Sequence, residues 1–291
     1  MWMVCSLGTL AASGNPSRGS AIEEKDRDSK TAARLLLDQV YAQYRSAQTY
    51  QASGNAMTVI VMPESNTETS IEATFTMKLA RPHYYRIEWT QHFEKPATQA
   101  GAVWNNGEGP HLYRSSTASL VRMESNQSAL SAATGDSMAI AHIIPTLFFH
   151  FDDKPNLLES LEDVDLEGSQ TIAGKPCHIV SGRVKNGIDY RLWISTNELF
   201  LIQVEYTLGG TLGGDAIVDP TPEQEERALK ATGREVTAEN REWLRESLRK
   251  ARDIMASVRG TSKQVHLHVD MTRPIPTEAF SFSLPEDETK K

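Results

Sequence analysis

The sequence of 291 residues predicts an α+β protein that contains an antiparallel sheet. Three observations predict this fold class. Several segments alternate apolar and polar residues with a period of two, these segments follow one another along the chain, and one segment in the middle is apolar nearly all round. Period-two alternation indicates antiparallel strands with one apolar and one solvated face. The apolar segment must be buried on most sides, so we expect a helix that covers the apolar face of the sheet.

Strand patterns recur along much of the chain. Residues 71–79 and 84–93 each have one apolar and one polar face. Residues 102–124 predict three short strands, because glycine, proline and serine clusters interrupt them at short intervals. Residues 199–206 alternate as well, and residues 263–272 predict a last strand. Polar turns at such regular spacing are typical of a meander, in which each strand pairs with the next.

A hairpin is predicted around Asn186-Gly187, the strongest short signal for a two-residue type I′ turn. The turn places Cys177 on the apolar face and the adjacent His178 on the other, since successive side chains of a strand point to opposite faces. The two side chains are therefore poorly placed for a catalytic dyad, and we interpret Cys177 as a small buried residue. The turn predicts three pairs on the apolar face: Arg183 with Tyr190, Ser181 with Leu192, and Ile179 with Ile194.

Three helical segments are predicted. The first spans residues 32–47, where apolar residues recur at helical spacing. The second spans about residues 128–161 and contains the apolar run, and Pro145 is expected to kink or divide it. The third lies within residues 223–259, after a glycine-rich stretch that we expect to be a flexible hinge. The expected N-cap and C-terminal stop of this third helix are Thr237 and Gly260.

The N-terminus resembles a processed targeting segment. Residues 1–14 are a mostly apolar, signal-peptide-like remnant, and residues 15–30 form a charged leader that we expect to be disordered. Cys5 is not expected to carry a lipid, because the large residues before it differ from the small ones usual ahead of a lipidated cysteine. Residues 31–291 are expected to form a single domain. The protein is expected to be exported to the periplasm or the cell envelope.

Composition and motifs argue against several functions. A net charge of −8 and a pI of about 5.6 provide no basic footprint for phosphates, so nucleic-acid binding is not expected. The longest later apolar run, Met138 to Phe151, is shorter than the roughly 20 residues that cross a bilayer. The sequence lacks the nucleophile-elbow, phosphate-loop, Cys-x-x-Cys and His-Glu-x-x-His signatures. We therefore expect a non-enzymatic protein without a cofactor.

One candidate metal site remains, formed by His266 and His268. Both project from the same face of the predicted last strand, and two histidines at this spacing can bind zinc. A zinc site needs a third protein ligand, for which Asp270 and His178 are the candidates. The alternative, which we favour, is that these side chains form a solvated outer face. The apolar residues on the opposite face would then be Val265, Leu267, Val269 and Met271.

The order of these elements and a few short segments resemble a known family. Gly174-Lys175-Pro176-Cys177 enters a strand, residues 191–195 read Arg-Leu-Trp-Ile-Ser, and two phenylalanines precede Pro285. Over about residues 32–285 this pattern resembles the bacterial outer-membrane lipoprotein carrier superfamily. The resemblance implies a strongly curved antiparallel sheet, an incomplete barrel, with helices over its concave face and a hydrophobic cavity that accepts acyl chains. The helix within residues 223–259 is expected to be an insertion relative to this plan.

The resemblance implies a protein that carries or senses a hydrophobic ligand, such as a lipid or the acyl chains of a lipoprotein. Release would require a helical lid to move, with Gly135 and Pro145 as flexible points. An alternative stays open, in which the inward side chains fill the barrel as core and the protein is a cell-envelope interaction module. The inserted helix would then dock a protein partner. The expected cavity residues are Phe75, Met77, Tyr85, Ile87, Trp89, Ile143, Leu147, Phe148, Tyr190, Leu192 and Ile194.

Overall fold

The computed structural model describes residues 18–62, 67–93, 98–149, 151, 155–185, 187–209, 220–231, 234–257 and 259–285. Its helices are α1 (Arg18–Ser46), α2 (Asn126–Asp136), α3 (Ile143–Phe149), α4 (Leu157–Ser160), α5 (Pro222–Ala231) and α6 (Ala238–Ser257), with 3₁₀ turns η1 (Ser115–Thr117) and η2 (Thr277–Phe280). Its strands are β1 (Thr49–Met62), β2 (Thr67–Ala80), β3 (Tyr84–His92), β4 (Thr98–Asn105), β5 (Pro110–Arg114), β6 (Ser119–Arg122), β7 (Glu162–Ile172), β8 (Lys175–Arg183), β9 (Asp189–Ser195), β10 (Leu201–Gly209) and β11 (Arg259–Asp270).

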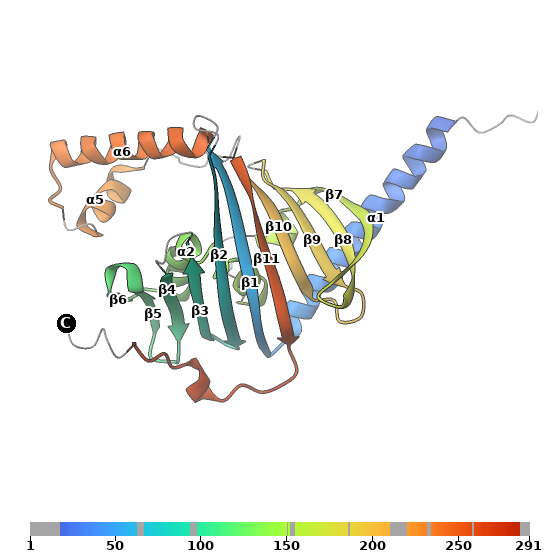
Figure 1. Cartoon of the computed structure of the whole chain (residues 1–291), viewed down its shortest axis with the longest axis horizontal. Coiled ribbons are helices and arrows are strands. Elements are labelled where there is room, and N and C mark those ends of the chain that lie inside the picture. The colour runs from blue at the N-terminus through green and yellow to red at the C-terminus, as the bar shows by residue number, and fades with distance from the viewer. Residues whose placement is uncertain are drawn as a thin grey trace, which may run out of the picture.

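All eleven strands belong to one sheet, in the order β6-β5-β4-β3-β2-β1-β11-β10-β9-β8-β7. Two meanders, β1 to β6 and β7 to β11, are joined where β1 pairs with β11 (Figure 1). Every pair in the sheet is antiparallel. The sheet does not close, because β6 and β7 remain as its two edges. The predicted fold class, an α+β protein with an open, curved antiparallel sheet, is confirmed.

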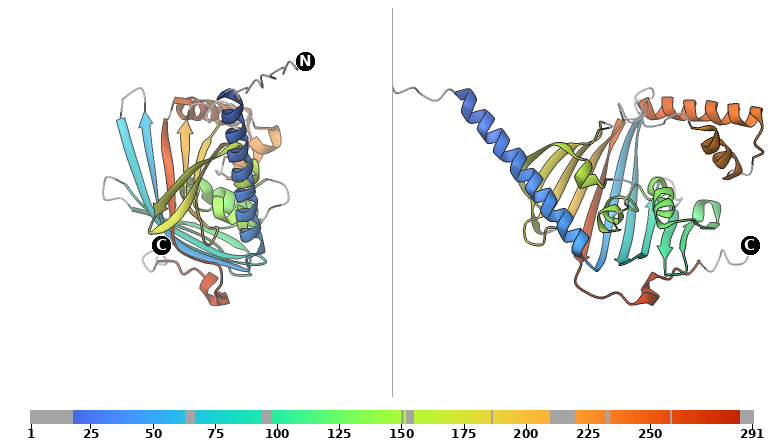
Figure 2. Two further views of the ribbon diagram at one scale, coloured as in Figure 1. Left: turned by 90° about the vertical axis from the view of Figure 1, so that its right-hand side faces the viewer. Right: turned by 180° about the vertical axis from the view of Figure 1, so that it is seen from behind.

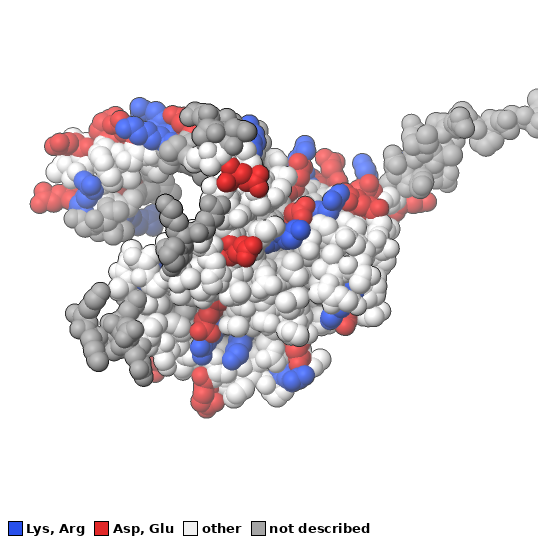
Figure 3. All heavy atoms as spheres, in the orientation of Figure 1, with Lys and Arg blue, Asp and Glu red and all other residues white. Residues whose placement is uncertain are grey.

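Helices α1 to α4 lie against the concave side of the sheet (Figure 2). Helix α1 crosses this side diagonally and contacts β7, while α2 contacts β4 and β5. Helices α5 and α6 lie beyond the far ends of β1, β2 and β11, away from the other helices (Figure 1). On the convex face, acidic and basic side chains are interspersed rather than separated into patches of one sign (Figure 3).

Glycines allow large aromatic rings to lie flat against the curved sheet. Gly54 of β1 pairs with Phe75 of β2, and Gly101 of β4 pairs with Trp89 of β3. A Cβ on Gly54 would lie 2.4 Å from the Phe75 ring, and one on Gly101 would lie 2.2 Å from the Trp89 ring. The rings therefore occupy the space that a side chain would need. Glycine paired with an aromatic residue in this way permits local curvature while the inner face stays apolar.

A single hydrophobic cluster fills the space between the sheet and the helices. Helix α1 contributes Ala33, Leu37, Val40 and Tyr44, which recur at helical spacing and are fully buried or nearly so. Helix α3 is apolar except for Thr146, and most of its side chains are buried. Burial of this apolar surface is the main contribution to the stability of such a layered domain.

The convex side carries a second, smaller cluster over β4 and β5. Trp104 and Tyr113 are covered by Phe282 and Leu284 of the C-terminal segment. The Phe282 ring lies 4.9 Å from that of Trp104 and 5.5 Å from that of Tyr113. Arg86 of β3 donates to the Ser281 carbonyl at 2.6 Å and holds the segment in place. This part of the sheet is thus buried on both faces.

Helix boundaries differ from the predicted ones. Helix α1 begins at Arg18, so the leader predicted to be disordered is helical from that residue onward; Ser29 in this part donates to the Leu166 carbonyl of β7. The predicted mid-chain helix is three short helices, broken over residues 137–142 rather than at Pro145. Pro145 lies in the first turn of α3, where a missing N–H is tolerated.

The predicted helix within residues 223–259 is also divided, into α5 and α6. Thr237 does cap α6, because its hydroxyl accepts a hydrogen bond from Asn240 N at 3.2 Å. Gly260 does not stop the helix; α6 ends at Ser257 and Gly260 belongs to β11. The signal-like remnant with Cys5, most of the glycine-rich hinge, and Asn186 lie outside the described residues.

The predicted register of the β8–β9 hairpin is wrong by one residue. The loop is longer than two residues: Val184 N donates to the Ile188 carbonyl at 3.0 Å, and Gly187 N donates back to Val184 at 2.8 Å. The observed pairs are Gly182 with Tyr190, Val180 with Leu192, and His178 with Ile194. Cys177 is buried, as predicted, but it pairs with Ser195. Because His178 pairs with Ile194, the shift of one residue exchanges the faces predicted for Cys177 and His178. Burial raises the pKa of the Cys177 thiol, which disfavours the thiolate.

The contact between Gly54 and Phe75 generates a testable prediction. Gly54→Ala is expected to destabilise the protein by about 1–3 kcal/mol, because the new Cβ would meet the Val265 carbonyl at 2.2 Å as well as the ring. Gly135→Ala in α2 is the matched control: it meets nothing within 4 Å and is expected to stabilise by up to about 1 kcal/mol. Urea unfolding of both variants measures the difference, and equal changes would contradict it.

Candidate functional site

The concave face brings the predicted cavity residues together. Ten of them lie in one hydrophobic cluster and are no more than 4 % exposed, and Tyr190 is half-buried and packs against this cluster. The ten are Phe75, Met77, Tyr85, Ile87, Trp89, Ile143, Leu147, Phe148, Leu192 and Ile194. Side chains of α3 therefore pack directly against side chains of the sheet.

Helix α3 is connected to α2 by a non-helical segment, residues 137–142, which we call the α2–α3 connector. Met138 and Ala139 in this connector have φ of 53° and 64°, a left-handed conformation that costs non-glycine residues about 1–2 kcal/mol each. The connector is thus held in an unfavourable backbone conformation by the contacts around it.

Two glutamines from the sheet hold the connector region. Gln264 of β11 donates from Nε2 to the Met138 carbonyl at 2.8 Å, and Gln91 of β3 donates to the Asp136 carbonyl at 2.9 Å. Their strands flank β1 and β2, where Ala56 and Ala73 pair with each other. Small residues at this point leave room for the chain that crosses above them.

Arg81, in the turn between β2 and β3, holds the other end of α3. Its guanidinium donates to the Phe148 carbonyl at 2.5 Å, to Ala47 at 2.9 Å and to Arg45 at 2.8 Å. It also lies 4.8 Å from the centre of the Phe148 ring. One cation therefore satisfies carbonyls at the C-terminal ends of both α1 and α3, where the helix dipole favours positive charge.

A polar strip runs along the inner face of β11. Ser262, Gln264 and His266 are buried there, whereas Lys263, Val265 and Leu267 on the other face are partly exposed. Ser262 lies 2.9 Å from the Thr58 hydroxyl. The predicted orientation of β11 is therefore wrong: His266 faces the interior rather than solvent.

The predicted histidine pair is separated by a local irregularity. His268 has a φ of 50°, and the pairing of β11 with β1 shifts in register near this residue, so His268 is exposed while His266 is buried. Asp270 binds the backbone of Thr272 and forms an ion pair with Arg273 at 2.7 Å. His178 lies on β8, three strands from β11. Within the described part of the chain, no group of three His, Cys, Asp or Glu side chains could hold a metal ion.

His266 is a fully buried titratable group of the inner face. Its Nδ1 lies 3.1 Å from the Tyr50 hydroxyl, and its ring packs edge-on to Phe75 at 5.2 Å. Burial lowers the pKa of His266 to about 4, so the imidazole is neutral at neutral pH. Burial also raises the pKa of Tyr50 well above its ordinary value. The pair is therefore an uncharged hydrogen-bonded unit inside an apolar cluster.

Three buried polar atoms of the interior have no hydrogen-bond partner among the described residues. They are the Nε2 atom of His266, the Oε1 atom of Gln264 and the hydroxyl of Tyr85. Buried polar atoms are normally paired, and leaving one unpaired costs about 1–3 kcal/mol. No sequence pattern indicated this strip, because the alternation of residues in β11 is compatible with burial of either face.

A small apolar pocket lies between α2 and the end of α3. It has a volume of about 270 Å³. Its lining comprises Gln127, Leu130, Ser131, His142, Thr146, Phe151 and Pro155. The pocket reaches the outer side of α3, so the helix is not packed tightly on every side.

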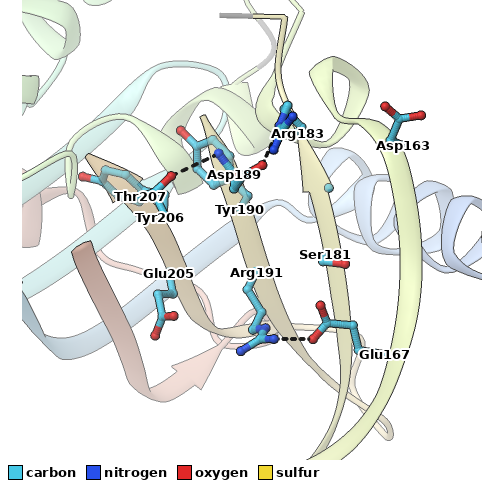
Figure 4. Close-up of a pocket in the computed structure, with 11 residues that line it drawn as sticks. Asp163, Glu167, Ser181, Arg183, Asp189, Tyr190, Arg191, Glu205, Tyr206 and Thr207 are labelled. Atoms are coloured by element: carbon cyan, nitrogen blue, oxygen red, sulfur yellow. Dashed lines mark hydrogen bonds and ion pairs between the residues drawn. The ribbon is translucent and has the colours of Figure 1, made fainter. Parts of the chain in front are cut away.

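A larger pocket of about 530 Å³ lies along β7 to β10 and is strongly charged (Figure 4). Arg183 and Asp189 form an ion pair at 2.6 Å, and Arg191 and Glu167 form another at 2.7 Å. Glu205, also in the lining, lies 3.7 Å from Lys263. Mutual pairing of these charges accounts for the arrangement as a solvated surface of the sheet.

The fold and site define an α+β protein in which a half-open antiparallel sheet buries an apolar concave face beneath short helices. Among the described residues, no helix is both long enough and apolar enough to cross a membrane. No model of a known protein family matches the chain, and no curated protein matches it.

Solved structures that are similar to the chain include lipoproteins and related proteins. A DUF1329 family protein from Desulfovibrio piger is 11% identical, with 87% of this chain and 97% of that chain covered and a TM-score of 0.30. Lipoprotein LppX from Mycobacterium tuberculosis is 8% identical, with 86% and 100% covered and a TM-score of 0.42. A predicted outer membrane lipoprotein-sorting domain from Vibrio parahaemolyticus is 5% identical, with 86% and 97% covered and a TM-score of 0.33.

TM-scores of 0.30 to 0.42 are too low for the likeness to carry a function over to this chain.

The buried imidazole generates a prediction for stability against pH. Because the folded pKa of His266 is about 4 and its ordinary value is 6.5, the unfolded chain binds a proton between these values that the folded chain does not. The free energy of unfolding should therefore fall on acidification across this window, by about 3 kcal/mol from His266.

Urea unfolding of wild type and His266→Phe between pH 7 and pH 4 measures this contribution. The variant, which keeps an aromatic ring beside Phe75, should lose about 3 kcal/mol less than wild type on acidification. Other titrating groups are common to both proteins and cancel in the difference. Parallel pH profiles would contradict the assignment.

Proposed function

We propose that the protein is a non-enzymatic, exported cell-envelope protein that binds a hydrophobic ligand on the concave face of its sheet. The observation that carries the proposal is α3, a seven-residue helix that buries almost only apolar side chains and is joined to α2 by the non-helical connector. A short apolar segment of this kind can leave the sheet as a unit and be replaced by another apolar chain.

The exchange of α3 for a ligand is close to balanced in hydrophobic energy. An acyl chain of ten methylenes gains on the order of 8 kcal/mol on burial, at about 0.8 kcal/mol per CH₂. Displacing α3 loses the burial of its own apolar side chains, so the ligand replaces one apolar contact by another of similar kind. The polar contacts of Arg81 and the two glutamines then decide how easily the helix leaves.

The predicted cavity residues are part of this proposal. Phe75, Ile87 and Trp89 would form the wall of the sheet, and α3 side chains such as Leu147 would be displaced with the lid. Hinge motion falls to the connector, whose left-handed residues relax when it leaves the sheet, rather than to Pro145. Candidate ligands are lipids or the acyl chains of a lipoprotein.

A second candidate function is an envelope protein-interaction module with a filled interior. The α5–α6 pair favours it: these helices are joined by Glu225, which pairs with Arg241 at 2.8 Å and Arg245 at 2.6 Å. Trp243 on α6 is 41 % exposed, with Arg234 lying 3.7 Å above its ring. An exposed tryptophan on a helix pair away from the core is typical of residues that anchor protein partners.

Binding of an uncharged apolar fluorophore, N-phenyl-1-naphthylamine, tests the two functions. Wild type is expected to bind it with a rise in fluorescence. Arg81→Ala should bind about tenfold more tightly, since losing a charged hydrogen bond to α3 lowers the cost of opening by more than 1 kcal/mol. Thermal unfolding monitored by circular dichroism checks that the variant remains folded.

Arg86→Ala is the matched control for this experiment. Arg86 holds the C-terminal segment on the convex side and does not contact α3, so its loss should leave fluorophore binding unchanged. Equal changes in both variants would contradict a role for Arg81 in holding the lid. Absence of binding in wild type and in Arg81→Ala would favour the interaction module.

A further inference from the structure

We infer that the polar end of the ligand binds to His266 and Gln264, and that the ligand is an uncharged amphiphile whose head both donates and accepts hydrogen bonds. The inference rests on the proposed function and narrows its ligand class. Two neighbouring side chains of β11 each end in an atom that has no hydrogen-bond partner in the described part of the chain, Nε2 of His266 and Oε1 of Gln264. Their residues are 1 % and 0 % exposed.

The two atoms lie in position to bind one head group. Residues two apart on a strand project from the same face, roughly 7 Å apart along the chain. The Tyr50 hydroxyl is bonded to Nδ1 of His266, which fixes the ring and leaves Nε2 as the free edge. The connector lies over Gln264, whose Nε2 donates to the Met138 carbonyl. When the connector leaves, this third polar atom also becomes available.

Chemistry of the free atoms specifies the head group. Oε1 of Gln264 can only accept, so the head must carry a donor such as a hydroxyl or an amide N–H. Gln264 Nε2, once released by Met138, can only donate, so the head must also carry an acceptor. An ester that only accepts would leave Oε1 unpartnered.

Charge at the site disfavours anionic heads. Among the described residues, the hydrogen-bond and ring contacts of the His266 and Gln264 side chains are with Tyr50, Phe75 and the connector carbonyl, none of which carries a charge. The imidazole itself is neutral, since burial lowers its pKa to about 4. A carboxylate or phosphate buried here would have no cation beside it, which is unfavourable in an apolar interior. Hydrocarbon attached to the head would meet Phe75 and the surrounding cluster.

Displacement of N-phenyl-1-naphthylamine from the full chain by three oleoyl compounds tests the inference. Monooleoylglycerol donates and accepts, methyl oleate only accepts, and oleate at pH 8 is anionic. Monooleoylglycerol should displace the fluorophore from wild type at concentrations at least tenfold lower than methyl oleate or oleate. Equal potency of monooleoylglycerol and methyl oleate in wild type would overturn the inference while leaving the proposed function intact.

Two variants assign the preference to these residues. Gln264→Leu removes both the unpartnered atom and the bond to the connector, and should reduce the preference for monooleoylglycerol to less than threefold. Gln91→Leu removes a glutamine hydrogen bond of the same kind, to the Asp136 carbonyl at the end of α2, without removing an unpartnered atom, and should keep the full preference. If Gln264→Leu fails to fold, His266→Phe serves in its place with the same expected loss of preference for monooleoylglycerol.

A preference that survives in the folded variant, or is lost equally in Gln91→Leu, overturns the inference. Failure of all three lipids to displace the fluorophore overturns the proposed function and the inference with it.

Discussion

The antiparallel pairing of β1 with β11 is the contact on which the structure depends. It joins the first strand to the last, over residues 51–61 and 259–270, and merges two meanders into a single sheet. Without it each meander would have an additional unpaired edge and only half of an apolar face. The pairing also determines which side chains of β11 point inward, so it places the polar strip of Ser262, Gln264 and His266 in the middle of the concave face.

The apolar inner face of a curved sheet must be shielded from water. Two helices of different length, α1 and α3, cover it here. Helix α1 is long, crosses the sheet and is joined to it directly, through the bond from Leu201 N to the Tyr44 hydroxyl at 3.2 Å. Helix α3 is short and is held mainly at its two ends, by Arg81 and by the region that Gln91 and Gln264 bind. In the proposed function, α1 would keep the sheet covered while α3 is exchanged for the ligand. Placing these two roles on different helices would let the site open without unfolding the domain.

Much of the fold follows from the sequence alone. Alternation in β2 and β3 identifies their inner residues correctly, and Phe75, Met77, Ile87 and Trp89 are buried as expected. The β8–β9 register does not follow, because the loop at Val184 is held by backbone bonds that lengthen the turn beyond the two residues its sequence favours. Local turn preference is overridden there by the pairing of the strands. Each residue of slip changes the partner of every later residue.

The site was less accessible to sequence reasoning than the fold. In β11 apolar residues alternate with Gln264, His266 and other polar ones, so periodicity identifies the strand but not the face that is buried. The partner strands determine which face of β11 is buried, and the polar side chains point inward where Tyr50 and the connector offer hydrogen bonds. The breaks in the mid-chain helix are equally non-local. Met138 and Ala139 adopt left-handed backbone because the sheet binds the carbonyls around them, which no propensity at those positions favours.

The C-terminal segment over Trp104 and Tyr113 makes the two halves of the sheet mechanically unequal. Strands β4 and β5 are clamped between α2 on the inside and Phe282 on the outside, so bending them would break two interfaces at once. Strands β7 to β9 have α1 and α4 on one side only, and their outer side is the charged surface of Figure 4. Strands β7 to β9 should therefore be the more deformable part of the sheet. They would adjust to ligands of different width, while β4 and β5 on the opposite side keep their shape.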